Sequence, residues 1–257
     1  MKIGSLAAAA TFGLIILLAQ GVAVEAAEVK VLSAAAMRAV MNELGPQFER
    51  ATGHKLVMQF DVIGVLKRQI DAGESFDVTI LTTPLIDDLV KEGKIAASTR
   101  ADIARSGIGV IVSTGAPKPD ISSADAFKRA MLNAKSISYP KEGATSIYLA
   151  SLFERLGIAE QMTSKTKHDQ VAGRALAQFV AAGEAELGLS VISGFEPVSG
   201  AELLGPLPSE LQNYVGYTAG VGATAKEGEV GKALIQFLKA PASVPVLKAK
   251  GMEPITP

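Results

Sequence analysis

The stretch that decides the fold is Val29-Lys30-Val31-Leu32-Ser33-Ala34-Ala35-Ala36-Met37-Arg38-Ala39-Val40. Its alternating apolar start predicts a buried strand, and apolar side chains then return at helical spacing through Met41 and Leu44. The small residues between the two patterns leave the first N–H groups of the helix uncovered, and the helix dipole adds positive potential there. The turn therefore suits an anion. A packed structural turn, with alanines that favour the helix, would give the same pattern. The rest of the chain must therefore distinguish an anion-binding turn from a purely structural one.

The same strand–turn–helix unit follows twice more. Strands are predicted at 55–60 and 76–81, and helices at 65–72 and 85–91, after a first helix at about 37–52. Successive units of this kind predict a parallel, right-handed α/β sheet. Ligands of open α/β sheets bind outside the carboxyl ends of the strands. Those ends are the turns at 34–38, 61–64 and 82–83.

A second block of α/β pattern occupies residues 108–200. A small-residue turn at 140–146 opens a helix at 146–156 in this block. Its predicted strands are 108–113, 136–139 and 186–191. We therefore expect an α/β fold of two lobes with a cleft between them. The expected lobes are residues 27–107 plus 201–257 for the first, and residues 108–200 for the second.

The composition excludes several classes of protein. The chain has 257 residues, 20% of them charged, and a formal net charge of −1, which argues against an electrostatic nucleic-acid binder. Cysteine is absent, so disulfides and thiolate sites are excluded. His54 and His168 show no metal-ligand spacing. We therefore expect no metal site and no cofactor.

Residues 1–26 read as a signal peptide. Lys2 supplies the positive start, an apolar run extends over 7–18, and small residues precede a cleavage site before Ala27. A membrane anchor is the alternative, but the apolar run stops at Gln20, short of the roughly 20 residues that a span needs. We expect export to the periplasm, no membrane span after cleavage, and a monomer.

Several segments resemble the periplasmic molybdate-binding-protein family, and together they extend over nearly the whole mature chain. They are 31–41, 66–73, 76–80, 174–188 and 237–252. The most specific of them is Leu66-Lys67-Arg68-Gln69-Ile70-Asp71-Ala72-Gly73. The resemblance implies a type II periplasmic-binding-protein fold with crossing hinge strands, an anion site between the lobes, and an ABC importer as partner.

The chain departs from that family at the expected anion site. Members that bind molybdate present serines in the first two turns and a tyrosine on a late strand, where this chain has Ala36, Val62-Ile63-Gly64 and Val191. Each unpaired buried oxygen of an oxyanion costs about 1–3 kcal/mol. We therefore expect molybdate to bind weakly, and a small organic carboxylate to be the ligand.

Candidate ligand-binding residues lie on the turns at the strand ends. They are Ala35, Ala36, Met37, Arg38, Val62, Ile63, Gly64, Thr82, Thr83, Ala144, Thr145, Ser146, Gly173, Arg174 and Val191. Arginine can hold a carboxylate through two parallel hydrogen bonds, so we expect Arg38 and Thr145 to face each other across the cleft. Arg38 and Lys67 also fit solvated helix positions, and Thr145-Ser146 fits a helix cap. Arg174 matches an arginine common in the family, which leaves a structural role open.

Two functions remain open. The first is an exported receptor that delivers a small anion to a membrane importer. The second is an enzyme on the same scaffold, because relatives of molybdate-binding proteins are similar to periplasmic aconitate isomerases, which move an allylic proton between trans- and cis-aconitate. Such an enzyme needs a base beside the substrate carbon. The candidate catalytic residues are Asp61, Glu142 and Asp169.

Overall fold

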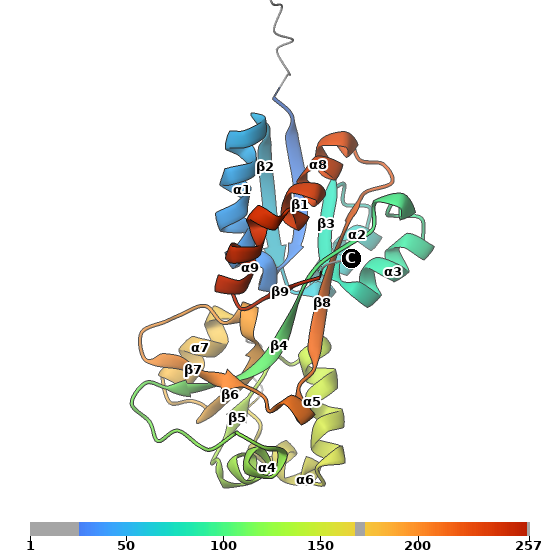
Figure 1. Cartoon of the computed structure of the whole chain (residues 1–257). Coiled ribbons are helices and arrows are strands. Elements are labelled where there is room, and N and C mark those ends of the chain that lie inside the picture. The colour runs from blue at the N-terminus through green and yellow to red at the C-terminus, as the bar shows by residue number, and fades with distance from the viewer. Residues whose placement is uncertain (1–25, 168–172, 256–257) are drawn as a thin grey trace, which may run out of the picture.

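The computed structural model describes residues 26–167 and 173–255. They form an elongated molecule of two bodies joined by crossing strands (Figure 1). We call the upper body in Figure 1 lobe 1 and the lower body lobe 2. The signal peptide predicted at 1–26 lies almost wholly outside the described residues.

Lobe 1 is built on the sheet that the opening stretch predicts. β1 (Glu28–Ala34) pairs in parallel with β2 (Lys55–Asp61) and with β3 (Val78–Thr82), which confirms the predicted parallel arrangement. The helices that follow these strands are α1 (Arg38–Thr52), α2 (Ile63–Asp71) and α3 (Thr83–Lys91). Two later helices complete the lobe, α8 (Gly228–Lys239) and α9 (Val244–Ala249).

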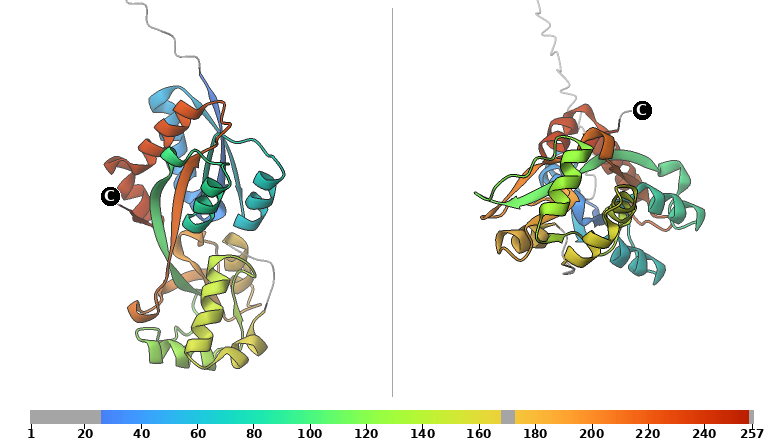
Figure 2. Two further views of the ribbon diagram at one scale, coloured as in Figure 1. Left: turned by 90° about the vertical axis from the view of Figure 1, so that its right-hand side faces the viewer. Right: turned by 90° about the horizontal axis from the view of Figure 1, so that it is seen from below.

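Two long strands cross between the lobes, β4 (Ala101–Ser113) and β8 (Tyr214–Val221). β8 runs antiparallel to β3 and to the first half of β4. From Ile108 onward, β4 pairs instead with β6 (Leu187–Val191) and β7 (Ala201–Pro206). β4 therefore belongs to the sheets of both lobes, and Figure 2 shows it passing from one to the other beside β8. The short β9 (Glu253–Pro254) also pairs with β4.

Lobe 2 has a smaller sheet covered by helices. β5 (Ile137–Ser138) pairs in parallel with β6 and completes the sheet. The helices of this lobe are α4 (Ala124–Asn133), α5 (Ala144–Arg155), α6 (Ala159–Lys165) and α7 (Arg174–Ala181). Phe127, Leu152 and Leu189 belong to the apolar core of lobe 2, while Met41, Phe48 and Leu234 belong to that of lobe 1.

The structure differs from the sequence prediction at several elements, and α9 and β9 are among those that were not predicted. The strand expected at 108–113 already begins at Ala101, because charged and small residues before Ile108 hide its extended pattern. β7 was not predicted, and neither was α6, whose buried contribution to the core comes from Met162. Because β7 pairs with β4 beside β6, and Leu207 lies in the lobe 2 core, we propose that residues 201–211 belong to lobe 2 and not to lobe 1 as the sequence predicts.

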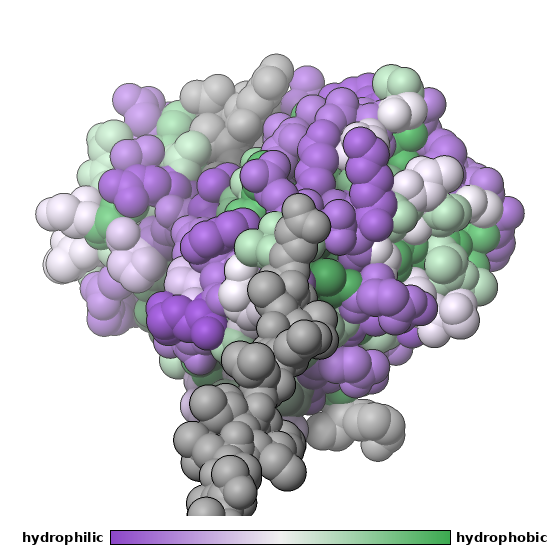
Figure 3. Space-filling view, turned by 90° about the horizontal axis from the view of Figure 1, so that it is seen from above, coloured by the Kyte–Doolittle hydropathy of each residue, from purple (hydrophilic) through white to green (hydrophobic). Residues whose placement is uncertain are grey.

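The outer surface is mainly polar where it can be seen. Viewed from above, the end of lobe 1 is mostly hydrophilic, with hydrophobic residues scattered among the polar ones (Figure 3). Scattered apolar residues of this kind are normal on a protein surface. Among the residues that the structure describes, no helix is both long and apolar enough to cross a membrane.

Candidate functional site

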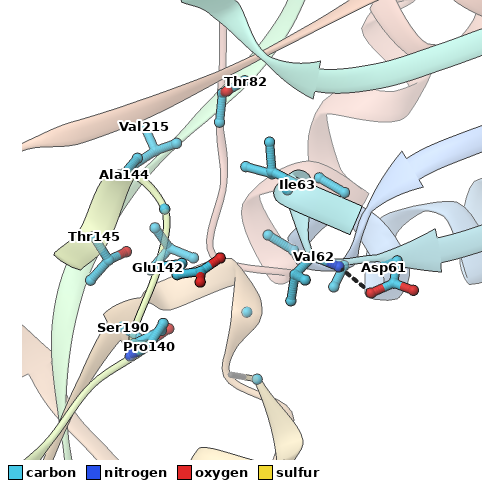
Figure 4. A pocket seen from close by; sticks show the side chains of 18 of the residues that line it. Asp61, Val62, Ile63, Thr82, Pro140, Glu142, Ala144, Thr145, Ser190 and Val215 are labelled. Carbon is cyan, nitrogen blue, oxygen red and sulfur yellow. Dashed lines mark hydrogen bonds between the residues drawn. The ribbon is translucent and has the colours of Figure 1, made fainter. Parts of the chain in front are cut away.

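A cavity of about 910 Å³ opens between the two lobes. Its walls come from the carboxyl ends of β1, β2, β3 and β6 and from the first turns of the helices that follow such strands. Figure 4 shows Val62 and Ile63 on the lobe 1 side facing Glu142 and Thr145 on the lobe 2 side. The volume lies within the range of small-molecule pockets, about 300–1,000 Å³.

Most of the residues that the sequence singled out line this cavity. The candidate ligand-binding residues in its wall are Ala35, Ala36, Arg38, Val62, Ile63, Gly64, Thr82, Ala144, Thr145, Gly173, Arg174 and Val191. Asp61 and Glu142, two of the three candidate bases, lie in the wall as well. The third, Asp169, lies outside the described residues.

Three candidate residues are placed elsewhere. Met37 ends a single 3-10 turn, Ala35–Met37, that directs its side chain inward, so it lies fully buried in the core of lobe 1. The Thr83 hydroxyl is 2.9 Å from the Thr218 hydroxyl and is therefore engaged by the crossing strand β8. The Ser146 hydroxyl donates to the carbonyl oxygen of Gly143, which leaves it a role in the helix start.

Helix N-termini converge on the cavity. The N-cap residues of α2, α3, α5 and α7 are Val62, Thr82, Gly143 and Gly173, and all of them line it. Within the described part of the chain, none of them caps its helix through a side chain. α4 lies away from the cavity and its N-cap Ser123 accepts from Ala126 N at 3.2 Å, whereas α6, α8 and α9 also lie away from it and have no side-chain cap. The uncapped N–H groups and their dipoles make the cavity suited to an anion.

Two glycines permit the lobe 2 helices to begin here. Gly143 has φ +104° and Gly173 has φ +60°, in the region where a side chain is strained. A β-carbon on Gly173 would also lie 3.2 Å from the carbonyl oxygen of Gly194. Glycine is thus needed at both positions to turn the backbone N–H groups into the cavity.

Three hydroxyls on largely buried residues line the cavity and have no hydrogen-bond partner within the part of the chain that the structure describes. Thr82, Thr145 and Ser190 are 8%, 6% and 4% exposed and all line the wall. Among the described residues, their hydroxyls form no side-chain hydrogen bond. Their oxygen atoms stay open to the cavity, since within the described residues Ser193 Oγ alone is a fully buried side-chain nitrogen or oxygen without a partner, so these three hydroxyls are available to a ligand. The sequence analysis missed Ser190, although it directly precedes Val191 at a strand end.

Apolar side chains form much of the remaining wall. Val62 and Ile63 contribute from lobe 1, and Ile147 and Val191 from lobe 2. Val62 and Ile147 are 47% and 74% exposed, which is unusual for large hydrophobic residues. An organic ligand would cover this surface, whereas a metal oxyanion offers it no apolar group.

Arg38 is already held by both lobes. Its Nε lies 3.8 Å from Oε1 of Glu196 in lobe 2, and its Nη2 donates to the carbonyl oxygen of Phe60 at 3.4 Å. The guanidinium carbon also lies 4.8 Å from the centre of the Phe60 ring. Arg38 and Thr145 both line the cavity, and the sequence analysis missed Glu196 as the partner of Arg38. Glu196 follows the end of β6, so a search beyond Val191 would have included it.

The other two cations in the wall differ from each other. Lys67 Nζ donates to Asp71 at 2.6 Å and to Glu92 at 3.2 Å, and these carboxylates, Asp71 foremost, raise the pKa of Lys67 above its usual value. Lys67 therefore stays protonated, and its positive charge is already paired with these two carboxylates. Arg174 is exposed in the first turn of α7 and has no ion-pair partner among the described residues. Arg174 is therefore the cation most available to an anion.

Tyr217 closes the cavity on the side of the crossing strands. It is 2% exposed on β8, and burial raises the pKa of its phenol well above the usual value, although contact with Ser193 acts in the opposite direction. The phenol therefore stays neutral. Within residues 26–167 and 173–255, no three His, Asp or Glu side chains gather as metal ligands would.

Two lobes joined by crossing strands, with an anion-suited cavity at the strand ends between them, define a type II periplasmic-binding-protein fold. The sequence profile described as "Bacterial extracellular solute-binding protein" matches residues 29–253, and the chain belongs to this family. The resemblance to molybdate-binding proteins noted from the sequence is thereby confirmed.

Two kinds of relative resemble this chain along most of its length. The chain is 32% identical to the molybdate-binding protein ModA of Azotobacter vinelandii over 89% of its length and 91% of that protein. It is 29% identical to an aconitate isomerase of a Pseudomonas species over 88% of its length and 87% of that enzyme. The solved structure of the Azotobacter vinelandii periplasmic molybdate-binding protein superposes with a TM-score of 0.72 and covers 89% of this chain and 99% of that one, at 19% identity.

Proposed function

We propose that this protein is an exported periplasmic receptor for a small organic carboxylate, which it delivers to an ABC importer. The observation that carries the proposal is the meeting of the uncapped N-termini of α2, α3, α5 and α7 around a cavity with apolar walls. The N-termini favour negative charge, and the walls favour a carbon skeleton.

Molybdate fits this wall less well than a carboxylate does. Ala36, Ile63 and Val191 present hydrocarbon where the molybdate-binding relatives are expected to present hydroxyl groups. A tetrahedral oxyanion carries oxygen on every side, so each apolar contact leaves an oxygen without a donor. A carboxylate directs its oxygens to one side and can place its carbon atoms against Val62 and Ile147.

A melting-temperature screen tests the proposal. Purified mature protein is heated with succinate, citrate and trans-aconitate in turn, and with molybdate and sulfate, because a ligand that binds only the folded state raises the melting temperature. We expect at least one carboxylate to raise it and molybdate to leave it unchanged. A rise with molybdate alone would overturn the carboxylate proposal.

Export is tested separately. The mature chain is expected to begin near Ala27, since residues 1–26 carry the signal-peptide pattern. N-terminal sequencing of protein released from the periplasm gives the answer. Retention of residues 1–26 in a membrane fraction would contradict export as a cleaved protein.

A periplasmic isomerase of a small polycarboxylate is the second candidate. The aconitate isomerase relative, similar over 88% of this chain, favours it. The carboxylate of Glu142 in the cavity wall supplies a group that could act as the base. Incubation with trans-aconitate, followed by detection of cis-aconitate, tests this function. Absence of cis-aconitate would reject the isomerase and leave the receptor as the proposed function.

A further inference from the structure

In the described part of the chain, the buried residues of the cavity wall carry hydroxyl groups and no charged side chain. The charged side chains that line the cavity, among them Arg38, Glu142 and Arg174, are all partly or fully exposed. The polar side chains on buried wall residues all end in a hydroxyl, and these residues are Thr82, Thr145, Ser190 and Tyr217. Since an unpaired buried charge costs far more than a hydrogen-bonded neutral group, the buried wall suits an uncharged polar group.

Thr82 and Tyr217 lie next to each other at the end of the lobe 1 sheet. The ladder between β3 and β8 pairs Thr82 with Tyr217, two residues beyond the pair of Ile80 and Ala219. Residues two apart on a strand share a face, and partners across a ladder are neighbours on that face. Ile80 and Ala219 belong to the apolar core of lobe 1. This face therefore ends at the cavity in two side chains that carry hydroxyls, and Figure 4 shows Thr82 in the wall.

Ser193 supports the Tyr217 phenol from lobe 2. It lies in the 3-10 turn Ile192–Gly194, and its hydroxyl contacts the phenol. Apart from that contact, Ser193 Oγ is the one fully buried side-chain oxygen or nitrogen of the described residues without a partner. Its backbone is fixed, because Ser193 N donates to Ser106 Oγ at 3.0 Å. A Ser193 hydroxyl that donates to the phenol oxygen leaves the phenol hydrogen free to donate into the cavity.

The N-terminus of α3, beside Thr82, suits an anion less well than those of α5 and α7. Pro84 is the second residue of α3 and has no N–H group, so one of the free donors of this helix is missing. The first turns of α5 and α7 contain no proline. A carboxylate is therefore better held at the lobe 2 helices, and the position between Thr82 and Tyr217 is left for another part of the ligand.

We propose that Tyr217 and Thr82 bind an uncharged hydroxyl group of the ligand, which makes the ligand a hydroxycarboxylate. The ligand hydroxyl accepts a hydrogen bond from the Tyr217 phenol and donates one to Thr82 Oγ1, while the carboxylate lies at the N-termini of α5 and α7. Ser193 is a positioning residue that acts through Tyr217. The inference rests on the proposed function and deepens it by naming the class of carboxylate.

Calorimetric titration of the full mature protein with two matched pairs of acids tests the proposal. The pairs are citrate with tricarballylate and malate with succinate, and within each pair only the hydroxyl group differs. The parent should bind the hydroxy acid about tenfold or more tightly than its partner, because an acid without the hydroxyl leaves Tyr217 and Thr82 unpaired.

Tyr217→Phe keeps the ring and removes the phenol oxygen. It should reduce the preference for the hydroxy acid by about five- to tenfold and leave the affinity for the acid without the hydroxyl unchanged. Ser193→Ala should reduce the preference in the same direction to a smaller extent. Tyr214→Phe, the same change at an exposed position of β8 outside the cavity wall, is the matched control and should keep the parent preference.

The outcomes separate this inference from the proposed function. Equal affinities within both pairs in the parent would overturn the hydroxyl site and leave the carboxylate receptor standing. A preference that survives in Tyr217→Phe, or an equal loss of affinity for both acids of a pair, would overturn the assignment to Tyr217. An unchanged preference in Ser193→Ala would overturn its positioning role. Absence of binding by every carboxylate would overturn the receptor and the inference together.

Discussion

Arg38 in lobe 1 and Glu196 in lobe 2 form an ion pair across the interlobe cavity, with Nε and Oε1 3.8 Å apart. Both side chains are partly exposed, at 41% and 33%, so the pair itself contributes little to stability. Its position matters more than its strength. A ligand carboxylate that binds Arg38 has to compete with Glu196 for the same guanidinium.

Removal of Arg38 should weaken ligand binding. A hydrogen bond to a charged group is worth about 1.5–3 kcal/mol, and partial exposure favours the lower end, so Arg38→Ala should raise the dissociation constant about tenfold. Calorimetric titration measures the change. Arg50→Ala, at the exposed end of the same helix, serves as the control. If Arg38→Ala binds carboxylates as the parent does, Arg38 plays no part in the site.

Removal of the Glu196 charge should act in the opposite direction. Glu196→Gln leaves Arg38 without its acidic competitor, and since such pairs are worth about 0–1 kcal/mol, carboxylate affinity should rise by up to about fivefold. The same titration measures it. A loss of affinity instead would mean that Glu196 positions Arg38 for the ligand.

The Thr145 hydroxyl should matter only when a ligand is bound. Thr145→Val removes a hydroxyl that opens into the cavity and has no side-chain partner within the described residues, so the ligand-free melting temperature should change little. Ligand affinity should fall by about 0.5–1.5 kcal/mol, or roughly two- to tenfold. Thr163→Val, on the exposed face of α6, is the control. Unchanged affinity would remove Thr145 from the site.

Gly143 and Gly157 offer a matched pair of strained glycines at opposite ends of α5. Their φ angles are +104° and +66°, so alanine at either position should lower the free energy of unfolding by about 1–2 kcal/mol. Only Gly143→Ala should also weaken ligand binding, because it reorients N–H groups that face the cavity. Chemical denaturation and calorimetry measure the two effects. Equal affinities for both variants would argue against an anion at the start of α5.

Asp102 should stabilise the crossing strands in a pH-dependent way. Burial raises the pKa of Asp102, but the hydrogen bond from Thr218 at 2.6 Å and the Arg100 guanidinium outweigh burial and hold the pKa below its usual range. A lowered folded-state pKa contributes stability above the unfolded value of about 3.9, and that contribution is lost as pH falls through the folded value. The melting-temperature difference between the parent and Asp102→Asn should therefore shrink on acidification. A difference independent of pH would contradict this account.

The local parts of the fold could be predicted from the sequence, and the contacts between lobes could not. β1 and α1 follow from the spacing of apolar residues, which changes from that of a strand to that of a helix after Ser33. Turns that join a strand to a helix in this way supply much of the cavity wall, including Ala36, Ile63 and Thr145. Met37 was wrongly expected in the wall because spacing alone does not give the direction of a side chain in a 3-10 turn.

The partners of the site residues depend on how distant segments meet. Glu196 and Thr218 lie far along the chain from Arg38 and Thr83, and only the docking of the lobes and the path of β8 bring each pair together. Glu142, Asp61 and Asp169 were equivalent in the sequence. Of the two that the structure describes, Asp61 is held by its own backbone neighbour and Glu142 has no partner there.

The central claim, that the cleft takes an organic carboxylate rather than a metal oxyanion, is tested most directly by paired calorimetric titrations of the mature protein. One titration uses molybdate, and the other uses the carboxylate that raises the melting temperature most. We expect saturable binding of the carboxylate, with a dissociation constant in the micromolar range or below, and no measurable heat with molybdate. A submicromolar dissociation constant for molybdate, with no carboxylate binding, would contradict it.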